Sequence, residues 1–269
     1  MAAQFALVGF GEAGSTFARS AGWHNEARAY DIDPARTLAM QECGVTACRE
    51  LPEALRGTDL VLSLVTAGQA LAAAQEACLA IASGAIFCDM NSVAPQTKRA
   101  AAEAIRQHGG RYVDVAVLAP VNPAGMNVPL LLSGDDGGEA AQALARLGFT
   151  NLRGVGDRVG QASAIKMIRS VMVKGLEALS DEMMAAAEAA GVADEVLASL
   201  DKSWREESWG ARVAYNQERM ATHGIRRAEE MEQAVLTLRD LGVYPLMTQA
   251  TVVRQRAAAE RTDEEEATR

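Results

Sequence analysis

Short apolar runs alternate with helical patterns through the first half of the chain. Phe5–Val8 is continuously apolar, as expected of a strand buried on both faces of a parallel sheet. Similar runs predict further strands that end at Asp31 or span 45–48, 59–65, 85–90, 112–118 and 129–133. Between them, amphipathic patterns predict helices over 34–43, 51–56, 66–82, 95–108 and 139–147. This alternation predicts an α/β fold with a doubly wound parallel sheet.

After Gly160 the pattern becomes helical throughout. Residues 161–190 form one long helical pattern, in which apolar residues recur at three- and four-residue steps: Ile165, Ile168, Met172, Leu176, Leu179 and Met183. Further helices are predicted over 194–208, 209–222, 226–241 and 245–259. The charged end of the chain has no apolar anchors and is expected to be disordered. We therefore predict an α/β domain over 1–159, an all-α domain over 160–259, and a disordered tail over 260–269.

A glycine cluster follows the first strand. Gly9, Gly11 and Gly14 stand in the order G-x-G-x-x-G, between a strand and a helix. In a Rossmann-type dinucleotide site, the first glycine permits a tight turn, the second lets the backbone approach a pyrophosphate, and the third lets the helix pack closely. The helix N-terminus offers N–H groups to the phosphates. Asp31 closes the next strand, where an acid can bind an adenosine ribose.

The cofactor expected at this turn is NAD or NADP. Asp31 favours NAD, because its charge would repel a 2′-phosphate, although Arg28 and Arg36 are close enough in sequence to leave the choice open. The loops after the strands at 59–65 and 85–90 belong to the same edge of the sheet. The predicted cofactor-binding residues are Gly9, Phe10, Gly11, Glu12, Ala13, Gly14, Asp31, Leu64, Val65, Thr66 and Asn91.

Composition narrows the class of protein. The net charge of −9 disfavours nucleic acid and anionic membranes as partners. The four cysteines show neither a C-x-x-C pair nor a metal-ligand spacing, so that we expect reduced thiols and no metal. The first strand begins almost at once, which leaves no room for a signal peptide, and no apolar run is long enough to cross a bilayer. These features predict a cytoplasmic location.

With these motifs, the chain from Phe5 to Ala259 resembles the β-hydroxyacid dehydrogenase superfamily, which includes 3-hydroxyisobutyrate and 6-phosphogluconate dehydrogenases. It is most similar to a 6-phosphogluconate dehydrogenase-like NAD-binding branch with a distinctive C-terminal domain of the DUF1932 type. The family's D-x-S-T-x-x-P substrate loop corresponds to DMNSVAP, with Asn91 and Ser92 at the polar positions. The family's Ser-Gly-Gly, which often touches a substrate carboxylate, is replaced by Leu118, Ala119 and Pro120, and this departure argues against a simple 3-hydroxy acid.

The superfamily's catalytic signature is a Lys followed three residues later by Asn or His, and then Asn. Here it reads KMIRS, so that Lys166 matches while Arg169 and Ser170 differ. By resemblance, Lys166 is the general acid/base, and a lysine in a partly dry cleft can titrate near neutrality. Lys174 lies two turns further along the same side of the helix. The alternative to a catalytic role is that this polar side of the helix has no function and faces water, as in any amphipathic helix.

The resemblance implies an NAD(P)-dependent dehydrogenase or reductase that acts on a small β-hydroxy or sugar acid. The expected substrate-binding residues are Asn91, Ser92, Arg169, Ser170, Lys174 and His223. His223, with Arg226 and Arg227, either caps a helix at the surface or grips an anionic group in the cleft. Two alternatives remain, an imine reductase, which the lysine argues against, and a nucleotide-binding protein without activity. The helical half is expected to form a homodimer, as is common in this superfamily.

Overall fold

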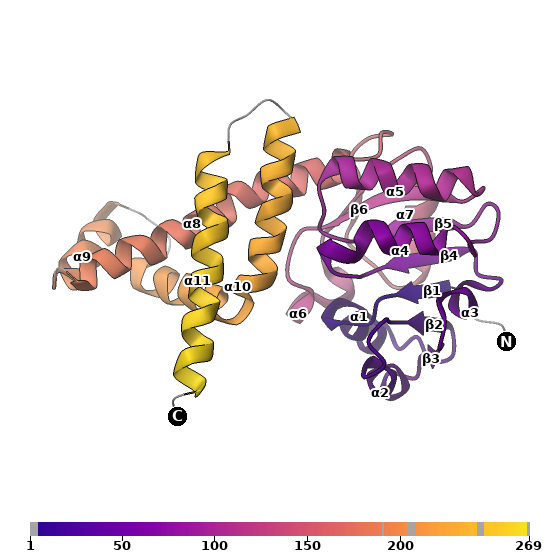
Figure 1. Cartoon of the computed structure of the whole chain (residues 1–269), viewed down its shortest axis with the longest axis horizontal. Coiled ribbons are helices and arrows are strands. Elements are labelled where there is room, and N and C mark those ends of the chain that lie inside the picture. The colour runs from indigo at the N-terminus through magenta and orange to yellow at the C-terminus, as the bar shows by residue number, and fades with distance from the viewer. Residues whose placement is uncertain (1–4, 190, 204–207, 241–244, 268–269) are drawn as a thin grey trace. The chain divides into compact units, whose positions relative to one another are not determined.

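The computed structural model describes residues 5–189, 191–203, 208–240 and 245–267, and it divides into two compact units, 1–166 and 167–269 (Figure 1). The predicted domain boundary at 159/160 lies just before helix α8, Gln161–Ala189. The first turns of α8 belong to unit 1, because their backbone amides bind side chains of the sheet. The boundary between the compact units therefore falls inside this helix.

An eight-stranded sheet forms the centre of unit 1, in the order β3-β2-β1-β4-β5-β6-β7-β8. The bounds are β1 Phe5–Val8, β2 Ala27–Tyr30, β3 Thr46–Ala47, β4 Leu60–Ser63, β5 Ile86–Asp89, β6 Arg111–Val117, β7 Leu130–Ser133 and β8 Leu152–Gly154. The predicted fold class is confirmed, with two differences. Strand β8 was not expected, and β7 runs antiparallel to β6. The segment that connects β6 to β7 holds only a four-residue helix and a 3-10 turn, which is too little for a parallel crossover.

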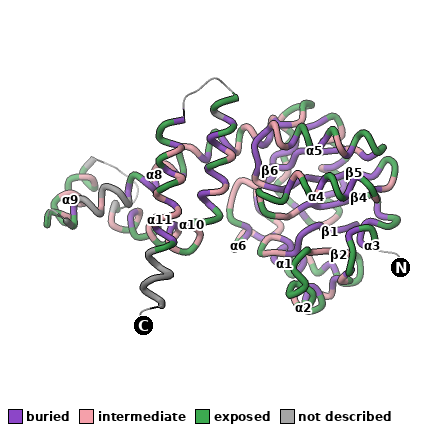
Figure 2. Tube along the Cα trace, in the orientation of Figure 1, coloured by how far each residue is buried: buried purple, intermediate pink, exposed green. Residues whose placement is uncertain are grey.

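The helices of unit 1 lie on both faces of this sheet (Figure 1). They are α1 Glu12–Ala21, α2 Arg36–Glu42, α3 Leu51–Leu55, η1 Ala67–Gln69, α4 Ala70–Ala77, α5 Pro95–Gln107, α6 Val121–Ala124, η2 Gly125–Asn127 and α7 Gly137–Arg146. Successive strand residues point to opposite faces, so that Leu7 packs in the cluster that includes Phe17 of α1, and Val8 in the one that includes Ile105 of α5. Strands β1, β4, β5 and β7 are buried along their length (Figure 2).

Unit 2 contains most of α8 together with α9 Ala193–Ser203, α10 Trp209–Asp240 and α11 Leu246–Ala267. Two sequence predictions are corrected here. The chain forms one continuous helix, α10, where two helices with a break near His223–Ile225 were expected. The end of the chain, expected to be disordered from residue 260, continues as helix through Ala267. Alanine, glutamate and arginine favour helix strongly, which is consistent with this extension. Among the described helices, none is long and apolar enough to cross a membrane.

Helix α8 buries much of its polar side, with Arg169 as an exposed exception, and exposes much of its apolar side. Ile168 is 50% exposed and Met172 66%, whereas Lys174 and Glu177 are buried. The Lys174 ammonium lies 2.6 Å from a Glu230 carboxylate oxygen, and Arg227 forms an ion pair with Glu177. Buried charges are tolerated when they are paired in this way. Ion pairs between α8 and α10 therefore decide which side of α8 faces inward.

Gly224 lies inside α10, where it packs closely against α11. An added Cβ at this position would collide with the carbonyl oxygen of Gln255 and come within 3.1 Å of Ala259, both on α11. The glycine therefore allows α10 and α11 to approach closely, and it does not end a helix.

We predict that Gly224→Ala destabilises the protein by about 1–3 kcal/mol, because the two helix backbones must move apart. Urea unfolding followed by circular dichroism measures this loss. Gly210→Ala in the same helix is the matched control, since an added Cβ there meets no atom within 4 Å and alanine favours helix. Equal stability of the two variants would contradict the packing role of Gly224.

Candidate functional site

The glycine turn lies between β1 and α1. Gly9 has a φ of +92°, and an added Cβ would come within 2.6 Å of the Leu64 carbonyl oxygen. At Gly11, where α1 starts, an added Cβ would meet no atom within 4 Å. At Gly14 it would lie 3.1 Å from the Gly9 carbonyl oxygen. The backbone therefore turns tightly at Gly9, packs closely at Gly14 and leaves open space over Gly11, an arrangement that fits a pyrophosphate at the helix N-terminus.

Asp31 stands directly after β2 and faces the turn. Its Oδ2 accepts a hydrogen bond of 2.6 Å from the Phe10 amide, and its Oδ1 accepts one of 2.9 Å from the Asp33 amide. Both arginines considered for a 2′-phosphate have other partners. Arg28 donates to the carbonyl oxygens of Glu53 and Arg56, and the Arg36 guanidinium lies 3.4 Å from an Asp33 carboxylate oxygen.

Asn91 ties together the loops that follow β4 and β5. Its Oδ1 accepts a 2.7 Å bond from the Val65 amide, and its Nδ2 donates a 2.9 Å bond to the Ser63 hydroxyl. Its own amide donates to Asp89 Oδ1 at 2.9 Å. Asn91 is buried, so that its main observed action is to hold these loops. Glu12, on the first turn of α1, and Thr66 are exposed, while Ala13, Leu64 and Val65 are half-buried.

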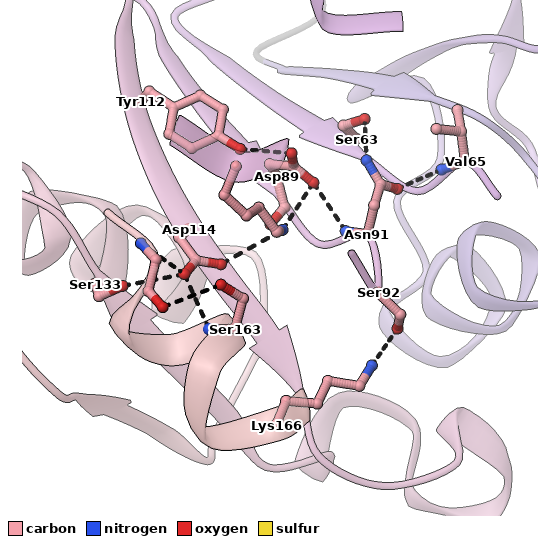
Figure 3. Close-up of polar contacts among 12 residues, drawn as sticks. Ser63, Val65, Asp89, Asn91, Ser92, Tyr112, Asp114, Ser133, Ser163 and Lys166 are labelled. Atoms are coloured by element: carbon pink, nitrogen blue, oxygen red, sulfur yellow. Dashed lines mark hydrogen bonds and ion pairs between the residues drawn. The ribbon is translucent and has the colours of Figure 1, made fainter. Parts of the chain in front are cut away.

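Lys166 and Ser92 meet in unit 1 (Figure 3). The Lys166 ammonium, from the second turn of α8, donates a hydrogen bond to the Ser92 hydroxyl, from the loop after β5. Both side chains are half-buried. The two residues that the family resemblance assigns to catalysis and substrate binding are thus brought together by segments far apart in the sequence.

A buried polar cluster, which the sequence analysis missed, lies beneath this pair. Ser63, Asp89, Asp114 and Ser133 occupy paired positions on β4, β5, β6 and β7, and each is fully buried. We call these four residues the polar row. In the sequence, Ser63, Asp89 and Ser133 each end an apolar run and Asp114 interrupts one, and this pattern could have indicated buried polar positions.

Lys98 of α5 neutralises the centre of the row. Its ammonium donates to the Asp89 carbonyl oxygen at 2.6 Å and to Asp89 Oδ1 at 2.9 Å, and lies 3.4 Å from Asp114 Oδ1. The Tyr112 hydroxyl donates a 2.5 Å bond to Asp89 Oδ2. Burial, helped by both carboxylates, raises the pKa of Tyr112 well above 10.

The row also anchors the start of α8. Asp114 Oδ2 accepts bonds from the Gly160 amide at 3.2 Å and the Ser163 amide at 2.9 Å, and the Ser133 hydroxyl accepts one of 3.0 Å from the Ala162 amide (Figure 3). A carboxylate at a helix N-terminus is favoured by the unpaired amides and the helix dipole. Ser163 lies three residues before Lys166, so that these bonds fix the turn that carries the lysine.

The structure gives several of the predicted substrate-binding residues other surroundings. Ser170 is buried, and Lys174 is buried against Glu230, whose charge partly opposes the lowering of the Lys174 pKa by burial. His223 lies within α10 and is half-buried, so that it caps no helix start. Arg169 is exposed. Arg226 bonds to Glu230 at 3.0 Å, and buried Arg227 pairs with Glu177.

The segment in place of the family's Ser-Gly-Gly is largely apolar in contact. Leu118 packs against the cluster of Ala116, Leu131 and Ala162, and its amide donates to the Pro129 carbonyl oxygen at 3.0 Å. Ala119 packs against the main core, and Pro120 has no N–H to donate. Within the described residues, no group of three or more His, Cys, Asp or Glu side chains could hold a metal ion.

Comparison with known proteins identifies two family models that match the chain. One describes the NAD-binding domain of 6-phosphogluconate dehydrogenase and matches residues 4–141. The other is a domain of unknown function, DUF1932, and matches residues 187–258. The division between them agrees with an α/β unit followed by a helical one.

Three solved structures are similar over nearly the whole chain. A conserved hypothetical protein from Sinorhizobium meliloti is 37% identical, with a TM-score of 0.76, covering 97% of this chain and 89% of that one. A conserved protein described as structurally similar to 3-hydroxyacid dehydrogenases is 29% identical, with a TM-score of 0.71, covering 95% and 96%. The 3-hydroxyisobutyrate dehydrogenase of Mycobacterium tuberculosis, solved with L-serine, is 17% identical, with a TM-score of 0.79, covering 98% and 96%, and shows the shared fold alone.

The raised pKa of Tyr112 predicts a loss of stability in alkali. Above pH 10 the unfolded chain releases the phenolic proton while the folded protein keeps it, so that the folded state binds more protons and stability falls by about 1.4 kcal/mol per pH unit from this group. Cys88, whose pKa burial raises to about 12, acts with the same sign above pH 9.

Urea unfolding between pH 8 and 11 measures this slope. Tyr112→Phe should lower the stability at pH 8, because it removes the bond to Asp89, and should flatten the decline above pH 10. Tyr215→Phe, at a 53% exposed tyrosine, is the control. Parallel pH curves for wild type and Tyr112→Phe would contradict the assignment.

Proposed function

The chain belongs to the family of the NAD-binding domain of 6-phosphogluconate dehydrogenase, and we propose that it is a dehydrogenase or reductase that transfers hydride between a nicotinamide cofactor and a small hydroxy acid, either a β-hydroxy or a sugar acid. An NAD(P)-dependent oxidoreductase is the activity class that this family supports. The observation that carries the narrower proposal is the contact of Lys166 with Ser92, on the loop that corresponds to the family's substrate loop.

The residues of the glycine turn fit the cofactor. Gly9, Gly11 and Gly14 hold the backbone where a pyrophosphate needs it, and Asp31 faces the turn where a ribose hydroxyl would bind. The bound nicotinamide would supply the hydride chemistry. The chain's own residues bind and orient the substrate and move its proton.

Lys166 is the proposed general acid/base. In the oxidation, its neutral amine takes the proton of the substrate hydroxyl while the carbon loses hydride, and the resulting ammonium returns that proton in the reduction. The Ser92 hydroxyl orients both the amine and the substrate oxygen. Arg169, three residues further along α8 and exposed, is our candidate for binding the substrate carboxylate. Lys174 has Glu230 as its partner, and we assign it no role in binding substrate.

The central test replaces Lys166. Lys166→Ala should lower kcat by about 10²–10⁴-fold with an unchanged Kd for NAD⁺, because the proton transfer is lost and the glycine turn is intact. Lys166→Arg should not restore activity, since a guanidinium stays protonated. A panel of hydroxy acids and their phosphates, followed by absorbance at 340 nm, identifies the substrate for this assay.

Lys202→Ala, at an exposed lysine of α9, is the control and should match wild type. Wild-type turnover by Lys166→Ala would remove this lysine from the mechanism. Reduction of cyclic imines with NADPH, with no hydroxy acid oxidised, would favour an imine reductase. Tight cofactor binding without any turnover would favour a protein that only holds the nucleotide.

We further propose that NAD is preferred over NADP. The Asp31 carboxylate would repel a 2′-phosphate. The two nearby arginines are held elsewhere, Arg28 by backbone carbonyls and Arg36 by Asp33. A cation would therefore have to leave an existing partner before it could bind the phosphate.

Isothermal titration with NAD⁺ and NADP⁺ tests this preference. Wild type should bind NAD⁺ at least about tenfold more tightly, equivalent to about 1.4 kcal/mol. Asp31→Ala should reduce the ratio of the Kd for NADP⁺ to the Kd for NAD⁺. Asp33→Ala should reduce the same ratio by releasing Arg36 to bind the 2′-phosphate. Asp135→Ala removes an exposed acid elsewhere and should leave the ratio unchanged. Tighter binding of NADP⁺ by wild type would refute the preference.

A homodimer is the proposed assembly. Lys174 and Glu177, on the polar side of α8, are paired within the chain. In contrast, Ile165, Ile168, Met172 and Leu179 remain 40–66% exposed along the helix. An extended apolar stripe of this kind is typical of an interaction surface, and a second copy of the chain presents the same stripe for a symmetric contact.

Light scattering coupled to size exclusion tests the dimer at micromolar concentration. Wild type should have twice the mass of one chain, and Met172→Glu should shift it toward the monomer by placing a charge in the contact. Leu79→Glu, at an apolar residue that is 75% exposed outside α8, should leave the mass unchanged. A monomeric wild type would refute the proposal.

A further inference from the structure

We propose that Lys98 is a positioning residue, whose ammonium holds Asp89 and Asp114 together and thereby sets the contact between Lys166 and Ser92. This inference rests on the proposed function, in which Lys166 is the general acid/base. Lys98 itself is excluded from contact with substrate, because it is 0% exposed. Its ammonium donates to the Asp89 carbonyl oxygen and to Asp89 Oδ1, and it lies 3.4 Å from Asp114 Oδ1 as an ion pair.

Asp89 and Asp114 need a cation between them. They are direct partners in the register of β5 and β6, and both are 0% exposed. Two buried carboxylates side by side repel one another, and water does not reach them to reduce the repulsion. Asp114 Oδ1 has no hydrogen-bond partner among the described residues, so that Lys98, 3.4 Å away, supplies its counter-charge.

One arm of this cluster leads to Ser92. Asp89 Oδ1 accepts the Asn91 amide, and the Asn91 side chain in turn binds the Val65 amide and the Ser63 hydroxyl. Ser92 is the next residue. The loop that presents the serine hydroxyl is therefore fixed through Asp89 (Figure 3).

The other arm leads to Lys166. Asp114 Oδ2 accepts the amides of Gly160 and Ser163 at the start of α8, one turn before the lysine. Gly160 has a φ of +102°, and an added Cβ would lie 3.1 Å from Pro95, the first residue of α5. The helix that carries Lys98 and the helix that carries Lys166 thus pack together where both begin.

The consequence is that one ammonium controls both sides of the proposed catalytic contact. If Lys98 is removed, the two carboxylates separate, and the Asn91–Ser92 loop and the first turn of α8 shift with them. A displacement of about 1 Å at a reacting group can lower a rate about 100-fold. Of the proposed cofactor contacts, the glycine turn after β1 and Asp31 lie outside both arms, and only Asn91 and Val65 lie on one of them. Cofactor binding should therefore be affected far less than the rate.

The test uses the full chain and two variants. Lys98→Met removes the charge and keeps an unbranched side chain that is one atom shorter. Lys98→Met with Asp114→Asn also removes the like-charge repulsion, so that it remains foldable if the single variant does not fold. In whichever variant folds, we expect kcat for the best hydroxy acid of the panel to fall about 10- to 100-fold with KM nearly unchanged. The pH profile of kcat should shift, because Lys166 loses its fixed partner, and the Kd for NAD⁺ should change far less than kcat.

Arg106→Met is the matched control, because Arg106 also lies on α5 and pairs with an acid, Asp135, at the surface. It should retain wild-type kcat and pH profile. A crystal structure of the Lys98 variant supplies a readout besides activity, in which Ser92 and Lys166 should no longer be in contact.

Three results would overturn the proposal. One is wild-type kcat and pH profile in the Lys98 variant, and another is retention of the Lys166–Ser92 contact in its crystal structure. The third is failure of both variants to fold, or loss of NAD⁺ binding in step with kcat, which would assign Lys98 to folding alone. The Lys166→Ala variant distinguishes failure of the positioning role of Lys98 from failure of the proposed function. If Lys166→Ala is inactive while the Lys98 variant is fully active, only the positioning role is refuted.

Discussion

Two carboxylates buried side by side on neighbouring strands impose the central constraint on this fold. Asp89 and Asp114 lie at paired positions on β5 and β6, and both are out of contact with water. They remain compatible with a folded state because Lys98 lies between them, Tyr112 donates to one, and the first amides of α8 donate to the other. Breaking a buried pair of this kind typically costs about 3–5 kcal/mol. The cluster therefore fixes where α5 and α8 begin relative to the sheet.

In the helical unit, ion pairs between α8 and α10 likewise stabilise buried charges. The α8 side chains that face inward carry charges, and Lys174 and Glu177 are paired with Glu230 and Arg227 on α10. Burial of these pairs turns the apolar side of α8 outward. In both units, buried ion pairs help to determine which face a helix packs against its neighbours.

Local features were predictable from the sequence, and nonlocal ones were not. The strand, the three glycines and Asp31 lie within one short stretch, where the identity of each residue follows from backbone geometry. The start of α8 was likewise placed correctly at Gln161. The polar row escaped prediction because its four members come from four strands, and each has an ordinary place in its own segment.

The errors have the same origin. Two helices were predicted over 209–222 and 226–241, and the sequence does not show that Gly224 between them packs against α11. Lys174 was expected to bind substrate because it shares a side of the helix with Lys166. Helical periodicity cannot show that Glu230 of another helix lies opposite it. The antiparallel direction of β7 depends on the short connection between β6 and β7, and sequence motifs do not indicate whether such a connection forms a crossover.

A crystal structure of the protein with NAD⁺ and a hydroxy acid tests the account most directly. The nicotinamide should lie beside Ser92, with the Lys166 nitrogen about 3 Å from the hydroxyl of the bound acid and Lys98 still between Asp89 and Asp114. A Lys166 side chain directed into bulk solvent, with another group beside the substrate hydroxyl, would contradict it.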